Sequence, residues 1–291
     1  MYRVNMSRIE AVARALKEIG VERILVLETR DPQYIALKDL ARERDCRTAF
    51  LVAVANALIS YRLTGYGEDY WTEVSQFFRK HNGSLEELFI EFLQKHSRYN
   101  RLSIAAKIRR LRKFFSSKLY NTLLEQPSKY CNDLYSLVKQ LSTIYRQPVN
   151  AKTIVFAAKM YSYVCRICHG KPVIDHRIEI PVDKRITTFT LTSGIVEPTE
   201  EQLTRENLRK HVETLMTKHR KLVLETWRKI SKETSIPPLQ LDTIIWLTTR
   251  YINIENQIEA IKKIIEKYGD IIPLKQLEQL YKESVYTINQ R

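Results

Sequence analysis

The sequence predicts an all-α protein, and three features of its composition and patterning lead to that fold class. The 291-residue chain has only seven glycines, apolar and polar residues alternate only weakly, and long segments rich in Leu, Ile, Lys, Glu and Arg dominate. Such segments are typical of amphipathic helices. With 44% hydrophobic and 28% charged residues, the chain has the composition of a folded globular protein rather than a disordered one.

The first third of the chain contains apolar segments of helical length, separated by glycines or polar turns. Helices are therefore expected over residues 7–19, 46–63, 69–81 and 84–96. The first is expected to end at Gly20, and the apolar run 22–29 that follows it is expected to be a strand or a buried turn. Ser84, with Glu87 three positions later, has the pattern of a capping box, in which each side chain bonds the backbone N–H of the other residue.

The segment 98–118 is the most basic part of the chain and is also expected to be helical. Lys107, Arg110 and Arg112 lie there amid an apolar stripe. This face is either a solvated charged surface or a wall that faces the phosphates of a nucleic acid, and the sequence leaves both interpretations open. A further helix is expected over 129–145.

A turn and a long helix follow in the middle of the chain. Pro148 favours a turn, and Asn150 is a suitable N-cap for a helix over 151–168 that Gly170 closes. The segment 178–185 is expected to be extended.

The last third of the chain again predicts helices. The residues 199–202 have the pattern of a second capping box, which opens a charged helical region that continues to about residue 232. Pro237 and Pro238 interrupt that region. Three closing helices are expected over 241–251, 257–269 and 274–285.

The charge balance favours an anionic partner. The chain has 48 Lys and Arg against 33 Asp and Glu, a net charge of +15, and its sequence pI is about 9.6. Such a charge attracts nucleic acid or an anionic membrane surface, although many basic proteins bind neither. No apolar stretch reaches the roughly 18 residues of a membrane span, and residues 1–20 have no apolar signal core. Four scattered cysteines do not suggest a disulfide framework, which favours the reducing cytoplasm. A monomer without a membrane partner is also expected.

One lysine and one aspartate form a candidate catalytic pair. Lys152 falls in the first turn of the helix over 151–168, where the positive end of the helix dipole disfavours an ammonium group. A lysine nucleophile must be neutral, so this position suits one. Asp183 lies in the segment 178–185, which is largely apolar and whose backbone is restricted by Pro181. Both residues are also consistent with ordinary surface charges, and Lys159, two turns into the same helix, is a rival nucleophile.

Five blocks of the sequence resemble the AGOG family of archaeal 8-oxoguanine DNA glycosylase/AP lyases, within the helix-hairpin-helix glycosylases. They are "DPQYIAL" (31–37), "NALISYRLTGYGEDYW" (56–71), "AKTIVFAAKM" (151–160), "IPVDKR" (180–185) and "LDTIIWL" (241–247), in the family's order. The resemblance implies two helical subdomains with an active-site cleft between them. One would comprise 46–158 with the hairpin, and 1–45 and 159–291 would form the other.

The resemblance also implies roles for individual residues. Lys152 would attack C1′ and form a Schiff base, and Asp183 would orient it and stabilise positive charge on the sugar. Phe156 and Trp71 would sandwich the extruded base, with Tyr70 as the alternative to Trp71. The residues that would contact the edge of the base are Gln33, Asp242, Trp246 and, as a weaker candidate, Ser60. The partner would be double-stranded DNA with an oxidised guanine, and the β-elimination would need no metal or cofactor.

Some features depart from the family or compete with it. The turn "RQPVNAK" (146–152) has no glycine, so Asn150 is expected to supply the tight geometry. "CRICH" (165–169) matches a haem-attachment pattern, but residues 1–20 have no apolar signal core. Related glycosylases can carry an iron–sulfur cluster on four closely spaced cysteines, but here only Cys165 and Cys168 are close in sequence. The alternatives to the enzyme are a glycosylase for another damaged base and a helical nucleic-acid-binding protein without catalysis.

Overall fold

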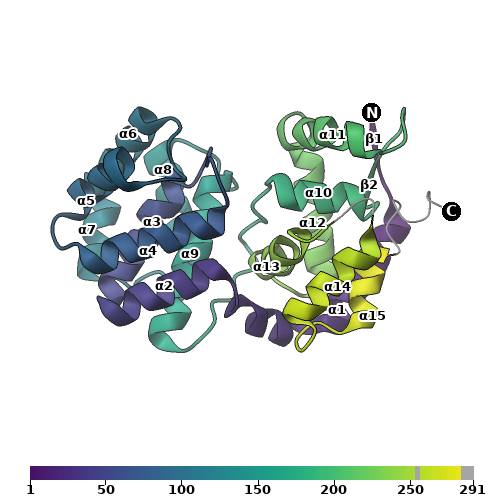
Figure 1. Ribbon diagram of the computed structural model, residues 1–291, viewed down its shortest axis with the longest axis horizontal. Helices are drawn as coiled ribbons and strands as arrows, with labels where there is room; N and C mark the ends of the chain where they lie inside the picture. Colours follow the sequence, from purple (N-terminus) through teal and green to yellow (C-terminus); the bar gives the residue numbers. More distant parts are fainter. Residues whose placement is uncertain (253–255, 283–291) are drawn as a thin grey trace. The chain divides into compact units, whose positions relative to one another are not determined.

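The computed structural model describes residues 1–252 and 256–282, and its regular structure is helical apart from two three-residue strands, which confirms the predicted all-α fold class. The chain forms two compact units (Figure 1). One, which we call the central unit, comprises residues 29–178. The other, the terminal unit, is built from both ends of the chain, residues 1–28 and 179–291.

The central unit is a bundle around two long apolar helices. Its elements are α2 (Pro32–Glu43), α3 (Cys46–Ile59), α4 (Gly67–Lys80), α5 (Leu85–Glu91), the π-helical turn η1 (Phe92–His96), α6 (Ile104–Phe115), α7 (Lys118–Glu125), α8 (Leu134–Tyr145) and α9 (Lys152–His169). Every residue of α3 from Ala49 to Ile59 is buried, as expected for a helix that is apolar on all sides. Its main neighbour is α9, against which α2 and α8 also pack.

The terminal unit joins residues from the two ends of the chain. Its elements are β1 (Tyr2–Val4), α1 (Met6–Glu28), α10 (Lys184–Thr192), β2 (Val196–Pro198), α11 (Arg205–Thr217), α12 (Arg220–Thr234), α13 (Pro238–Thr249), α14 (Gln257–Tyr268), α15 (Leu274–Leu277) and the π-helical turn η2 (Glu278–Lys282). The two strands pair antiparallel, with Tyr2 opposite Pro198. Helix α1 packs on α12 and α13, and α10 packs on α11 and α13.

Several helices differ from the sequence-based expectation. Residues 22–28 continue α1 as helix, so the predicted strand or turn is wrong; Gly20 (φ 78°, ψ 155°) only kinks the helix, because glycine tolerates positive φ. Helices α2, α7 and α10 were not expected. Helices α2 and α10 each follow an aspartate N-cap: Asp31 accepts a hydrogen bond from the Gln33 N–H (2.8 Å), and Asp183 accepts one from the Ile186 N–H (3.0 Å). That local signal was present in the sequence.

The predicted helix starts were also partly wrong. Ser84 occupies an N-cap position but makes no side-chain capping bond, and the second capping box is formed by Thr204 and Asn207 rather than by residues 199–202. The N-cap of α9 is Ala151, one residue after Asn150. The helix predicted over 46–63 ends at Ile59. Residues 283–285 of the last predicted helix lie outside the described residues.

The central unit has different boundaries from the subdomain expected over 46–158. Helix α9 is continuous from Lys152 to His169, so a boundary after residue 158 would cut through it. Helix α2 packs on α3, α4 and α9 and therefore belongs to the same unit. The unit consequently extends from residue 29 to residue 178.

The expectation of unpaired cysteines was wrong. Cys46 at the start of α3 forms a disulfide with Cys168, and Cys131 forms one with Cys165. Cys165 and Cys168 stand three positions apart in α9, so both disulfides fix the C-terminal part of this helix. The two cysteines of "CRICH" are therefore both bonded to other cysteines.

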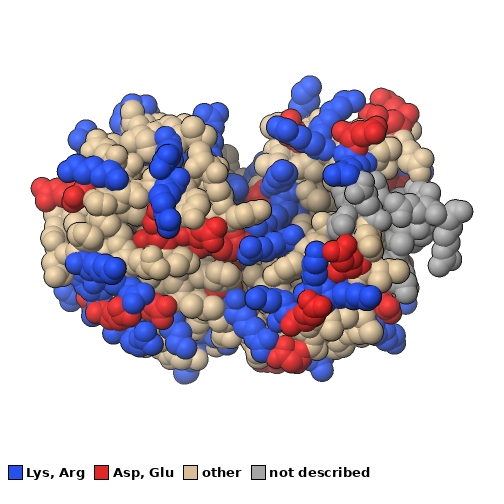
Figure 2. All heavy atoms as spheres, in the orientation of Figure 1, with Lys and Arg blue, Asp and Glu red and all other residues tan. Residues whose placement is uncertain are grey.

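Basic side chains are numerous on the surface of both units. Figure 2 shows Lys and Arg spread over the visible face of each, with acidic side chains interspersed. Many of the cations have carboxylate partners on the surface, such as Arg79 with Glu43 and Lys263 with Glu259. Within residues 1–252 and 256–282, none of the helices combines the length and the apolar character that a membrane span requires.

Candidate active site

The candidate nucleophile, Lys152, directly follows the turn between α8 and α9. Arg146 adopts the left-handed conformation (φ 50°, ψ 45°) at the end of α8. The turn then closes with a hydrogen bond from the Ala151 N–H to the Pro148 carbonyl (2.9 Å). Asn150 lies within this four-residue turn, whereas the left-handed conformation in the connection falls on Arg146, four residues earlier. Lys152 is the first residue of α9, and its side chain is exposed.

Two aromatic side chains lie close together within the central unit, beside the start of α9. Phe156, one turn after Lys152, is half-buried, and Trp71 of α4 is buried. Their ring centroids are 5.9 Å apart and the rings meet edge to face, at 82°. Tyr70 points elsewhere, because its hydroxyl donates to the side chain of Asn56 and accepts from Asn100. Of the two aromatic candidates on α4, the structure places Trp71 against Phe156.

Gln33 and Ser60 occupy different surroundings in the same unit. Gln33, at the start of α2, is 3% exposed, and its side-chain nitrogen lies near Gly67, the first residue of α4. Ser60 caps the C-terminus of α3, where its hydroxyl donates to the Asn56 carbonyl (2.7 Å). That bond uses the one proton the hydroxyl can donate, so only its acceptor capacity remains for a ligand.

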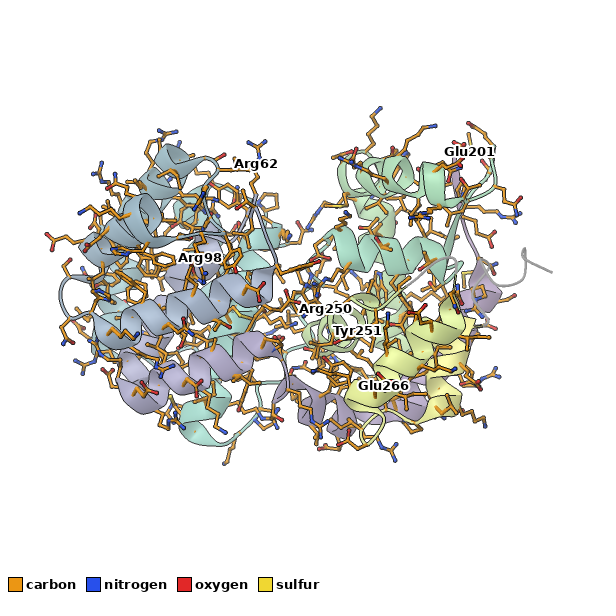
Figure 3. The ribbon with its side chains drawn as sticks, viewed as in Figure 1. Arg62, Arg98, Glu201, Arg250, Tyr251 and Glu266 are labelled. Atoms are coloured by element: carbon orange, nitrogen blue, oxygen red, sulfur yellow. A yellow bond between two sulfur atoms is a disulfide. The ribbon has the colours of Figure 1, made fainter. Side chains whose placement is uncertain are left out.

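The loop that begins with Ser60 packs against a second loop. The Thr64 N–H donates to the Tyr99 carbonyl (2.8 Å). Arg62 and Arg98 stand on these two loops (Figure 3), and Arg98 pairs with Glu73 of α4 at 3.1 Å. The loops thus place exposed guanidinium groups on the surface of the central unit, close in sequence to Ser60 and Tyr99.

The rival nucleophile Lys159 is enclosed in the protein. It is 2% exposed, and its ammonium nitrogen lies 5.7 Å from the ring centroid of Tyr163. Tyr163 donates to the fully buried carboxylate of Asp31 (2.9 Å). Burial raises the pKa of Asp31, and the nearby Lys159 ammonium opposes that rise. Lys159 is thus placed as a buried counter-charge, whereas Lys152 is reachable from solvent.

The remaining candidates lie in the terminal unit, on α10 and α13. Asp183 is half-buried and caps α10 through the Ile186 N–H. Asp242 is 2% exposed in α13, and Trp246 follows one turn later. The structure thus brings Gln33, Ser60, Trp71, Lys152 and Phe156 into one unit and Asp183, Asp242 and Trp246 into the other.

Arg185, which no sequence motif singled out, contacts one of these residues. Its guanidinium lies over the Trp246 ring, with 3.8 Å between the Arg185 Cζ and the ring centroid, and also donates to the Trp246 carbonyl (3.0 Å). A cation over an indole face holds the ring in one orientation. The only sequence signal was a basic residue two positions after Asp183.

Comparisons with known proteins agree with a helical enzyme that acts on DNA. A family model for AGOG, described as N-glycosylase/DNA lyase, matches residues 13–281. The N-glycosylase/DNA lyase of Thermococcus kodakarensis is 32% identical over 278 residues, which cover 94% of this chain and 95% of that protein. That of Pyrobaculum aerophilum is 31% identical over 261 residues, 88% of this chain and 92% of that protein.

A solved structure is similar over nearly the whole chain. The crystal structure of the 8-oxoguanine DNA glycosylase from Pyrobaculum aerophilum, complexed with 8-oxoguanosine, matches with a TM-score of 0.71 and 28% sequence identity. The match covers 94% of this chain and 97% of the other. The class is therefore that of the DNA glycosylases with lyase activity, as the sequence predicted. Within that class, the chain belongs to the AGOG family.

Proposed function

We propose that this protein removes 8-oxoguanine from double-stranded DNA and then cleaves the strand through a lysine Schiff base. The choice of 8-oxoguanine as substrate rests on the similarity, over 94% of the chain, to a glycosylase whose structure was solved with 8-oxoguanosine. The exposed position of Lys152 at the start of α9 supports its role as the nucleophile. A reactive amine needs access to C1′ of an extruded nucleotide, and the buried Lys159 has none.

The proposed reaction proceeds in two stages on the same lysine. The neutral amine of Lys152 attacks C1′, the N-glycosidic bond breaks, and the base leaves with the bonding electrons and takes up a proton. Loss of a proton from nitrogen and opening of the sugar give the imine. Removal of a C2′ proton then allows the C3′–O bond to break and release the 3′ phosphate, and water hydrolyses the imine. Asp183 would stabilise the positive charge that develops on the sugar.

The proposed base pocket combines stacking with edge contacts. Stacking on Phe156 and Trp71 does not distinguish 8-oxoguanine from guanine, because both bases have similar faces. The altered edge has an added oxygen at C8 and a proton on N7, so discrimination requires polar partners such as Gln33, Asp242 and the Trp246 indole N–H. A polar group left unsatisfied by the wrong base costs roughly 1–3 kcal/mol.

Stacking requires a change in the aromatic pair. Phe156 and Trp71 now meet edge to face with their centroids 5.9 Å apart. A base held between two parallel rings needs about 7 Å between the ring planes, twice the carbon–carbon contact distance of about 3.5 Å. We therefore propose that the half-buried Phe156 turns when the base enters, since the fully packed Trp71 has less room to move.

The decisive experiment compares Lys152→Gln with a matched control. We expect Lys152→Gln to abolish strand cleavage of an 8-oxoguanine duplex and covalent trapping by borohydride, while duplex binding persists. Lys118 is also an exposed lysine at the first position of a helix, α7, so Lys118→Gln should behave as the wild type.

The same assay tests each part of the proposal. Cleavage by Lys152→Gln at the wild-type rate would reject Lys152 as the nucleophile. A wild-type protein that cleaves duplexes with another damaged base, but none with 8-oxoguanine, would reject the substrate.

A further inference from the structure

Arg110 of α6 links the two sides of the turn that precedes the proposed nucleophile. Its Nη2 donates to the side-chain oxygen of Gln147 (3.0 Å) and to the hydroxyl of Thr153 (2.7 Å). Gln147 belongs to the turn after α8, and Thr153 is the residue after Lys152. The two protons of a single nitrogen therefore connect the turn to the first turn of α9.

The same side chain is also held from the side of α8. The Arg110 Cζ lies 4.0 Å from the ring centroid of Tyr145, and the Tyr145 hydroxyl donates to the Arg110 carbonyl (2.9 Å). Arg110 thus contacts the last residue of α8, the turn and the start of α9. These three contacts immobilise the guanidinium at the point from which Lys152 projects.

The charge of Arg110 is not used in an ion pair. Within the described part of the chain no carboxylate pairs with it, and its buried Nε has no hydrogen-bond partner. Burial lowers the pKa of Arg110, although a guanidinium stays charged in proteins. A half-buried cation without a carboxylate is costly, and its contacts all converge on the turn before Lys152.

We propose that Arg110 is a positioning residue that fixes the first turn of α9 and thereby the place of Lys152 relative to C1′. The inference rests on the proposed function of Lys152. It assigns Arg110 to the reaction rather than to phosphate binding, which the basic stripe of the sequence had left open. Displacement of a reacting group by about 1 Å can lower a rate about 100-fold, so Arg110 can affect catalysis without touching the substrate.

The test separates the chemical step from binding and folding. Single-turnover cleavage of an 8-oxoguanine duplex is measured with saturating enzyme, alongside the duplex Kd, at a temperature where melting curves show each variant to be folded. For Arg110→Met we expect a rate lowered about 10- to 100-fold, with Kd unchanged within about threefold. Arg110→Lys should not restore the rate, because an ammonium lacks the planar fork that spans two acceptors.

Two further variants sharpen the result. Thr153→Val removes only one acceptor at nearly constant volume, so it should slow cleavage in a folded protein even if Arg110→Met folds poorly. The double variant Arg110→Met/Thr153→Val should be no slower than the slower of the two single variants, because both changes remove the same Arg110–Thr153 hydrogen bond. Arg109→Met changes the exposed neighbouring arginine on α6 and should leave the rate unchanged.

The possible outcomes are distinct. Wild-type rates in Arg110→Met, Arg110→Lys and Thr153→Val would overturn the inference and leave the proposed function intact. A loss confined to Kd, with a weaker salt dependence, would overturn it in favour of a phosphate contact. A wild-type protein that neither cleaves nor becomes trapped would overturn the proposed function and this inference together.

Discussion

The buried amine of Lys107 shows how strongly one residue depends on its surroundings. Lys107 is completely buried and donates to the side-chain oxygen of Asn100, and its nitrogen lies 4.8 Å from the ring centroid of Tyr61. Asn100 in turn donates to the hydroxyl of Tyr70 (2.9 Å). Burial lowers the pKa of Lys107 to about 8, with a further contribution from the positive charge of Arg62.

This pKa predicts a pH dependence of stability. The unfolded lysine has a pKa of about 10.4, so between pH 8 and pH 10 the unfolded state binds a proton that the folded state lacks. Stability from this group therefore rises with pH in that window. We expect the free energy of unfolding of the wild type, relative to that of Lys107→Met, to increase by roughly 2 kcal/mol from pH 7.5 to pH 10.

Urea titrations at several pH values measure this difference. The control is Lys113→Met, which changes an exposed lysine of the same helix and should give a curve parallel to the wild type. If the Lys107→Met curve is also parallel, Lys107 keeps an ordinary pKa in the folded protein.

At the scale of an element, α9 connects the proposed chemistry to the stability of the central unit. Lys152 and Phe156 lie in its first two turns, and Cys165 and Cys168 in its last two. Between them, Lys159 is buried near Asp31, and the helix packs on α2, α3 and α8. The end of α9 that carries the proposed nucleophile thus belongs to a helix whose other end is covalently fixed to α3 and to the loop after α7.

The two disulfides should contribute unequally to stability. The Cys46–Cys168 bond closes a separation of 122 residues and the Cys131–Cys165 bond one of 34. Loop-closure entropy assigns them about 5 and about 4 kcal/mol respectively. We expect the double variant Cys46→Ser/Cys168→Ser to unfold at a lower guanidinium concentration than Cys131→Ser/Cys165→Ser, and both below the wild type.

Thiol counting provides an independent control. Alkylation of the wild type in denaturant without reductant should label no cysteine, and alkylation after reduction should label four. Labelling without reductant, together with unchanged unfolding midpoints, would contradict both disulfides.

At the scale of the whole molecule, net charge and fold support a DNA partner, but the cysteines complicate the expected compartment. Disulfides are typical of oxidising compartments and also occur in intracellular proteins of hyperthermophilic archaea. The cytoplasmic location and the monomeric state therefore stay predictions. The charge of +15 has a consequence that can be measured directly.

Affinity for a DNA duplex should fall steeply with salt. Each neutralised phosphate contributes about 0.9 to the slope of log affinity against log salt concentration. Arg112 is 65% exposed in its side chain, so we expect Arg112→Glu to lower the slope, whereas Arg110→Met should leave it unchanged because that guanidinium is bonded within the protein. Fluorescence anisotropy between low and moderate salt measures the slope.

Two results would be contrary to this expectation. A flat wild-type response would argue against contacts with the DNA backbone altogether. A steep response that Arg112→Glu does not change would mean that this face of α6 is solvated and lies away from DNA.

The sequence by itself determined the helical class, most helix positions and the location of Lys152 at a helix start. Each of these depends on local features: apolar periodicity, proline, and the residues next to a helix end. Even local signals were misjudged where two caps competed, as at Thr204 and residues 199–202, and the aspartate caps of α2 and α10 were overlooked. The membership of the family also followed from the order of short blocks.

Only the tertiary structure decided which distant residues meet. It paired Cys46 with Cys168, placed Trp71 rather than Tyr70 against Phe156, buried Lys107 and Lys159, and joined Arg110 to Gln147 and Thr153. The residues in such contacts are separated in sequence by as few as 7 positions, for Lys107 and Asn100, and by as many as 122, for Cys46 and Cys168. They depend on how the helices pack, and helix packing is set by the combined shape of many side chains, which local propensity does not specify.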